Sequence, residues 1–225
     1  VLKAVRGFRG DFAHHIKIGR GSMSLDQPVP CVSQCPAGVD IPGYVALVKE
    51  GRYADAVRLI RKDNPLPAVC GLICEHPCET RCRRTMMDDP INIRGLKRFA
   101  VEHAGEVPVP EPAPSTGKRV AVIGGGPGGL SAAYYLALMG HHVTIFEQRK
   151  QLGGMLRYGI PSYRLPREAL DREIQQILSL GIQVHTETCV GNQPSIAEIR
   201  EEYDAVYLAI GAHIDRKIGI EGEEA

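Results

Sequence analysis

Tryptophan is absent from this chain of 225 residues, and aromatic residues together make up only 5% of it. Proteins that bind single-stranded nucleic acid depend on such rings to stack bases. An excess of charge of one sign is also lacking, since the formal net charge at pH 7 is +1. A nearly neutral chain has little electrostatic attraction for nucleic acid or an anionic membrane. We therefore expect no nucleic-acid partner.

Long hydrophobic runs are missing too. No stretch approaches the roughly 18 uninterrupted apolar residues of a membrane-spanning helix, and residues 1–7 contain no apolar run suited to a secretory signal. We expect a cytoplasmic protein without a membrane span. Because the first residue is not Met, we also expect that residues precede it. Apolar residues still account for 44% of the chain, which is enough for a core.

Cysteine is the residue whose placement is most informative. Six of the seven cysteines stand in two tight groups, which read Cys31-x3-Cys35-Pro and Cys70-x3-Cys74-x3-Cys78-x3-Cys82. In the second group the thiols recur about one helical turn apart, so they converge on a small volume. Four converging thiolates are what an iron–sulfur cube requires. The spacing therefore predicts a cluster.

Two other interpretations of the cysteines remain open. A structural zinc site also uses four cysteines, although zinc knuckles commonly contain Cys-x2-Cys and every local spacing here is x3. Disulfides would need an oxidising compartment and usually join distant elements. Cys189 stands alone in a strand-like run, and we expect it to be a buried core thiol.

A glycine-rich loop forms the second informative motif. The apolar run 120–123 precedes Gly124-x-Gly126-x-x-Gly129, and a helical pattern follows. Such glycines allow a tight turn, close approach of a pyrophosphate and close helix packing, while the helix N-terminus receives the negative charge. Glu147 ends the next strand, where a carboxylate accepts hydrogen bonds from ribose hydroxyls and favours FAD or NAD over NADP. The candidate residues in this motif are Gly124, Gly126, Pro127, Gly128, Gly129, Glu147 and Gln148.

Composition and periodicity divide the chain into four parts. Residues 1–30 form a weakly patterned N-terminal arm, 31–104 a small α-helical domain, and 105–117 a Pro-rich, semi-rigid linker. Residues 118–225 alternate strand and helix and form a partial Rossmann-like α/β domain with a parallel sheet. The expected helices are 40–51, 52–62, 93–103, 128–139 and 165–180, and the expected strands are 119–123, 143–146 and 205–210.

The motifs resemble one family in particular. Residues 31–99 and 120–212 are similar to the small subunit of glutamate synthase and its relatives, which include the N-terminal part of dihydropyrimidine dehydrogenase and the large subunit of ferredoxin-dependent NADP transhydrogenase. The stretches that carry this resemblance are 35–42, 63–67, 70–82, 90–99, 153–166 and 204–212.

The resemblance implies FAD in the glycine-loop pocket. It places three more groups of residues around the flavin or its adenine end, namely Gly154, Met155 and Leu156, then Arg164, and then Val190, Gly211 and Ala212. It also implies that the family continues beyond Ala225 with a nicotinamide-binding domain. This chain would then be a fragment or be completed by a partner.

The resemblance further implies 4Fe–4S ligation by the six grouped cysteines, with three departures. Residues 1–30 lack the upstream Cys-x2-Cys of the two-cluster version. Lys97 replaces a Gln or Glu ligand, and an ammonium cannot coordinate iron. Cys70 matches a position that is not a ligand in some relatives. Family topology groups Cys35, Cys74 and Cys78, which Cys70 would complete. It places Cys31 and Cys82 near a second cluster, which would need a partner chain or an unusual ligand.

These inferences predict an oxidoreductase that passes electrons between FAD and a 4Fe–4S cluster. We expect NAD(P)H or ferredoxin as the electron partner, other oxidoreductase subunits as protein partners, and no catalytic acid or base, because the cofactors carry the chemistry. One alternative is a relay subunit of a larger electron-bifurcating complex. Another is a structural module stapled by zinc.

Overall fold

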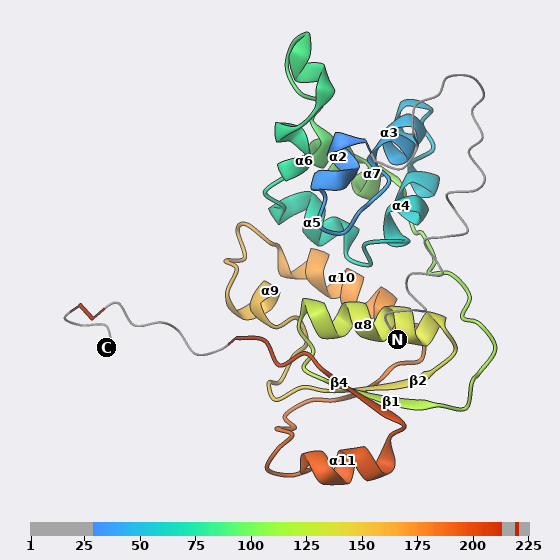
Figure 1. The fold of residues 1–225 in the computed structure, drawn as a ribbon, viewed down its shortest axis with the longest axis vertical. Helices are drawn as coiled ribbons and strands as arrows, with labels where there is room; N and C mark the ends of the chain where they lie inside the picture. Colours follow the sequence, from blue (N-terminus) through green and yellow to red (C-terminus); the bar gives the residue numbers. More distant parts are fainter. Residues whose placement is uncertain (1–28, 213–218, 221–225) are drawn as a thin grey trace.

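The structure is a computed structural model that describes residues 29–212 and 219–220. The predicted N-terminal arm, apart from its last two residues, lies outside the described residues. The remainder forms two bodies, one of short helices and one built on a parallel sheet, with helices α8 and α10 between the first body and the sheet (Figure 1). None of the described helices is both long and apolar enough to cross a membrane.

Short helices build the body that carries the six grouped cysteines. Side-chain caps begin two of the three helices expected here, since Asp40 accepts a hydrogen bond from the amide of Gly43 at 3.0 Å and Asn92 accepts one from Gly95 at 2.9 Å. The elements are α2 (Pro30–Gln34), α3 (Ile41–Lys49), α4 (Tyr53–Arg61), α5 (Pro67–Ile73), α6 (Pro77–Thr80), the 3-10 helix η1 (Arg83–Met86) and α7 (Ile93–His103). Helices α3, α4 and α7 confirm the three expected helices, whereas α2, α5 and α6 were not expected.

Four parallel strands form the second body, in the order β3-β2-β1-β4. Its elements are β1 (Arg119–Ile123), α8 (Pro127–Leu138), β2 (His142–Phe146), α9 (Met155–Tyr158), α10 (Arg167–Leu178), β3 (Gln183–His185), α11 (Ile196–Glu202) and β4 (Ala205–Leu208). Helices α8 and α10 cover one face of the sheet and α11 covers the other (Figure 1). This confirms the predicted α/β architecture with a parallel sheet.

Strand β4 is an edge of the sheet within the described residues. Three apolar side chains in and just after it are largely exposed: Tyr207 at 43%, Leu208 at 63% and Ile210 at 61%. The edge therefore combines apolar surface with backbone groups that pair with no further strand in the described part of the chain.

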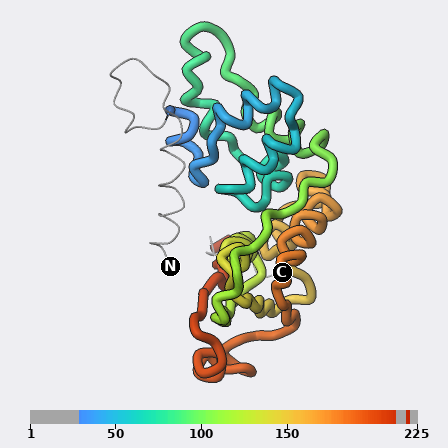
Figure 2. Tube along the Cα trace, turned by 90° about the vertical axis from the view of Figure 1, so that its right-hand side faces the viewer, coloured from blue at the N-terminus to red at the C-terminus, as the bar shows by residue number. Residues whose placement is uncertain are grey.

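Residues 105–117 run along the side of the molecule from the helical body to the sheet (Figure 2). They are extended, as the prolines predict, but they also form hydrogen bonds with both bodies. Val107 is buried, its carbonyl accepts a hydrogen bond from Arg61 at 2.5 Å, and the amide of Ala113 donates to the carbonyl of Leu138 at 2.9 Å. The linker is therefore packed against both bodies and does not hold them apart.

The two bodies share buried side chains. Leu66 and Val69, which lie at the start of α5, belong to the same apolar cluster as Leu130, Ile145 and Leu170 of the α/β body. A second cluster, which includes Tyr44, Ile60 and Cys78, fills the helical body. The helix that carries Cys70 is therefore anchored on the α/β body.

Candidate functional site

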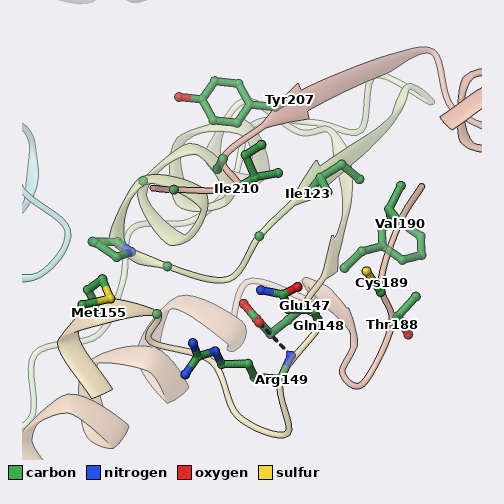
Figure 3. A pocket seen from close by; sticks show the side chains of 18 of the residues that line it. Ile123, Glu147, Gln148, Arg149, Met155, Thr188, Cys189, Val190, Tyr207 and Ile210 are labelled. Carbon is green, nitrogen blue, oxygen red and sulfur yellow. Dashed lines mark hydrogen bonds between the residues drawn. The ribbon is translucent and has the colours of Figure 1, made fainter. Parts of the chain in front are cut away.

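The glycine-rich loop lies at the carboxyl end of β1 and opens onto a pocket of about 800 Å³ (Figure 3). Gly124 adopts φ 107°, which favours glycine. A Cβ on Gly129 would overlap the carbonyl oxygen of Gly124, and a Cβ on Gly154 would lie 2.7 Å from the Cα of Gly126. The loop is thus held by backbone contacts that tolerate no side chain.

The N-terminus of α8 faces this pocket without a side-chain cap. Gly126 is the N-cap residue, and the first helical hydrogen bond runs from the amide of Leu130 to its carbonyl at 2.9 Å. The amides of Gly128 and Gly129 precede that bond, and a Cβ on Gly128 would meet open space. Free amides at a helix N-terminus of this kind are able to receive the negative charge of a phosphate group.

Glu147 lies beneath the loop and is only 6% exposed. Its carboxylate accepts hydrogen bonds from the amides of Gly125 and Arg149, both at 2.8 Å. Part of its role is therefore to hold the loop. A carboxylate has about four lone-pair positions, so it retains capacity for the ribose hydroxyls that the sequence predicts.

Most of the residues predicted to bind the dinucleotide line the pocket. These are Gly124, Gly126, Pro127, Gly128, Glu147, Gln148, Gly154, Met155, Val190, Gly211 and Ala212. Three others do not. Gly129 lies inside the loop contact, Leu156 is a buried core residue, and Arg164 is exposed and pairs with Glu75 of the cysteine segment at 3.2 Å.

The pocket also contains residues that the motifs did not indicate. Arg149 lines it and places its guanidinium 4.3 Å from the ring centre of Tyr158, and Tyr207 reaches it from β4. Cys189 corrects an expectation: it is exposed and lines the pocket because β3 ends at His185, before the cysteine. The strand-like composition around Cys189 misled the sequence-based expectation, since the chain there forms a loop.

The grouped cysteines are all free thiols and come together from several elements. Cys35 follows α2, Cys70 lies in α5, Cys74 ends α5, and Cys78 lies in α6. The thiol of Cys78 interacts electrostatically with those of Cys35 and Cys74, and the thiol of Cys70 with that of Cys74. These are the four cysteines that the family resemblance assigns to one cluster, and that assignment stays a prediction.

Burial is the main influence on these thiols. It raises the pKa of Cys78 to about 11, with a further contribution from Cys35, and it raises the pKa of Cys70. Cluster iron binds thiolates, so ligation must displace protons from these sulfurs. The backbone amide of His76 donates to the sulfur of Cys74 at 3.3 Å, a contact that stabilises negative charge there.

Cys31 lies in α2 and Cys82 precedes η1, and Cys31 packs against the same apolar cluster that contains Cys78. Burial raises the pKa of Cys31, and the nearby Cys82 thiol adds to this shift. In residues 29–212, no three Cys, His, Asp or Glu side chains are grouped as a site for a single metal ion. A structural zinc ion needs four donors at roughly 2.0–2.3 Å. The donor set of several thiols with an amide hydrogen bond to the Cys74 sulfur fits an iron–sulfur cluster.

Two buried residues in this region were missed by sequence reasoning. Tyr44 is fully buried beside Cys78, Cys35 and Cys31, and its hydroxyl donates to the carbonyl of Ile93 at 3.0 Å. The burial of Tyr44 arises from tertiary packing, which local sequence patterns do not report.

The second buried residue that sequence reasoning missed is Glu173 of α10. Its carboxylate accepts hydrogen bonds from the amides of Ala68 and Val69 at 2.7 and 2.9 Å, which caps α5 from the α/β body.

Comparison with known proteins agrees with both parts of the site. Residues 26–108 match the family described as dihydropyrimidine dehydrogenase domain II, 4Fe-4S cluster, and residues 122–188 match the NAD(P)-binding Rossmann-like domain. The helical body is therefore a 4Fe–4S domain of this type, followed by a Rossmann-like dinucleotide-binding domain.

Curated relatives extend the match over the chain. The NADPH-Fe(3+) oxidoreductase subunit beta of Geobacter sulfurreducens is 43% identical, over 100% of this chain and 35% of its own length. The NADP(+)-dependent formate dehydrogenase subunit beta of Moorella thermoacetica is 42% identical, over 87% of this chain and 31% of that one. The glutamate synthase [NADPH] small chain of Mycobacterium tuberculosis is 37% identical, over 89% and 42%.

The family expected from the motifs is confirmed: this chain belongs with the glutamate synthase small chains and related oxidoreductase subunits. It spans about a third of the length of the first relatives named above. The family and the two domain matches also support FAD and a 4Fe–4S cluster as the cofactors.

Proposed function

We propose that this chain transfers electrons between FAD and one 4Fe–4S cluster as part of a cytoplasmic oxidoreductase complex. The observation that carries the proposal is that one chain holds both a pocket of about 800 Å³ at the uncapped N-terminus of α8 and a cysteine-rich helical body whose helix α5 packs into the core of the α/β body. NAD(P)H or ferredoxin would be the electron partner, reached through residues beyond this chain or another subunit.

The residues of the chain divide the work between the two sites. When bound, FAD exchanges electron pairs with a nicotinamide and single electrons with a cluster. Gly126 and Gly128 would accommodate the pyrophosphate, and Glu147 the ribose. Cys35, Cys70, Cys74 and Cys78 would hold the cluster. Cys31 and Cys82 would contribute to a second cluster only with ligands from elsewhere.

Cofactor content tests the proposal directly. We expect about four irons, a matching amount of sulfide and one FAD for each anaerobically purified chain, and about eight irons if a second cluster forms. Cys78→Ser should lower iron and leave FAD in place. Cys189→Ser is the matched control and should leave iron unchanged, because Cys189 belongs to the pocket and not to the cluster.

Two outcomes of the cofactor measurements would contradict the proposal, and an activity measurement separates it from the relay role. Zinc without sulfide or flavin would indicate the zinc-stapled module, and full iron in Cys78→Ser would remove Cys78 from the ligand set. Reduction of acceptors by NAD(P)H only after partner subunits are added would favour the relay role within a larger complex.

A further inference from the structure

Lys97 is buried without a counter-charge. It lies in α7, is 8% exposed, and makes no hydrogen bond or ion pair with any other residue of the described part of the chain. Its neighbours on the same helix are partnered: Arg98 pairs with Glu102 at 2.7 Å, and Arg94 donates to the carbonyl of Cys74 at 2.9 Å. Lys97 is therefore the exception on this helix.

Packing directs Lys97 towards the cysteines. Helices α5 and α7 approach so closely that a Cβ on Gly71 would lie 3.1 Å from the Cα of Arg98. Cys70 is the residue before Gly71, and Lys97 is the residue before Arg98. Lys97 also follows Arg94 by three residues, so the two side chains share one face of α7, and Arg94 donates to the carbonyl of Cys74. Lys97 thus lies on the face of α7 that meets the cysteine-bearing helix α5.

An ammonium on a side chain that is mostly removed from water, with no charged partner, lowers stability. A compensating anion removes this cost. Four thiolates carry more negative charge than an iron–sulfur core carries positive charge, so a ligated cluster is an anion. An ammonium has three donors and no lone pair, and it can balance that charge although it cannot bind iron.

We propose that Lys97 is the counter-charge of the cluster held by Cys35, Cys70, Cys74 and Cys78, and that it raises the reduction potential of that cluster. This inference rests on the proposed function. Reduction adds one negative charge to the cluster, and a fixed positive charge in a poorly solvated position stabilises the reduced form more than the oxidised form.

The test is a redox titration of the cluster in the cofactor-loaded protein, followed by electron paramagnetic resonance. At the wild-type midpoint potential, Lys97→Met should show about a tenfold lower ratio of reduced to oxidised cluster, which corresponds to a midpoint about 59 mV more negative for a one-electron couple. Lys97→Arg should keep the ratio near the wild-type value because it keeps the charge. Lys49→Met, which removes an exposed charge from α3, is the matched control and should have no effect.

An unchanged midpoint in Lys97→Met would overturn the inference. If Lys97→Met assembles no cluster, the iron and sulfide content of the two variants is compared. Normal content in Lys97→Arg would support a requirement for positive charge at this position. Equal loss of iron and sulfide in both variants would overturn the inference. A wild-type protein without any cluster would instead contradict the proposed function.

Discussion

At the scale of single residues, the dinucleotide pocket depends on glycines whose Cβ positions are occupied by backbone atoms of the glycine-rich loop. Gly129 packs on the carbonyl of Gly124, and Gly154 packs on Gly126. A rigid backbone cannot move away as a flexible side chain can, so these positions are sensitive to the addition of even one methyl group. Gly128 differs, because its missing Cβ would point into open space.

Gly129→Ala should therefore destabilise the protein and lower its FAD content. Overpacking of this kind costs about 1–3 kcal/mol or more. Gly128→Ala is the matched control: in flavin-free protein it should be neutral or stabilising by about 0.5–1 kcal/mol, because Ala is favoured over Gly within a helix. Thermal unfolding and the ratio of FAD to protein are the measurements. Equal stability of the two variants would contradict the packing argument.

At the scale of elements, the helices that carry the cysteines are short and draw support from elsewhere. Helix α5 begins at Pro67 without a side-chain cap of its own, and its first amides donate to Glu173 of α10. The same helix is held near its middle by the contact of Gly71 with α7. The position of Cys70 and Cys74 is therefore set by two other helices.

Glu173 should make stability depend on pH. Burial raises its pKa to about 7, whereas an unperturbed Glu has a pKa of about 4.3. Between these values the folded protein binds more protons at this group than the unfolded chain does, so stability falls as pH rises. The slope is at most about 1.4 kcal/mol per pH unit, the value for one proton.

Glu173→Gln should remove this part of the slope in denaturant unfolding of the holoprotein at several pH values within that window. Glu168→Gln, which changes an exposed carboxyl in the first turn of the same helix, should retain the slope. A slope that survives in Glu173→Gln would show that another group causes it.

The elements also show how far sequence reasoning extends. Helices α3, α7 and α8 and strands β1, β2 and β4 were predictable, because caps, glycine punctuation and apolar runs are local signals. Helices α5 and α6 were missed, since they span only 7 and 4 residues and begin at proline.

In the candidate site, six of the residues that line the pocket followed from the glycine motif and the acidic residue after the next strand, and five more followed from the family resemblance. The assignment of four cysteines to one cluster also came from the resemblance and stays a prediction. The burial of Lys97 and Glu173, the exposure of Cys189 and the pairing of Arg164 with Glu75 were not predictable, because each depends on contacts between distant segments.

At the scale of the whole molecule, the two bodies are joined through a common core. Leu66 and Val69 come from the helical body and pack in the core of the α/β body, and Arg61 joins α4 to the linker and to Gln176 of α10 at 2.5 Å. The distance and orientation between the two sites are thereby fixed by buried contacts, in addition to the linker.

Leu66→Ala should accordingly weaken both bodies together. Loss of a buried leucine costs about 2–5 kcal/mol, and the visible absorbances of cluster and flavin should be lost in a single transition at lower denaturant than in the wild type. Met86→Ala removes a side chain that is 84% exposed, so it should change stability by no more than about 0.5 kcal/mol. Separate transitions for the two cofactors would show that the bodies unfold independently.

The β4 edge bears on how this chain behaves in concentrated solution. A sheet edge with exposed apolar side chains is a template on which another copy can add its own edge. Tyr207, Leu208 and Ile210 give this edge apolar surface, and neither Pro nor Lys interrupts the strand. We therefore expect this edge to promote association in concentrated solution, and a charged substitution at Leu208 to reduce that association without touching the six grouped cysteines.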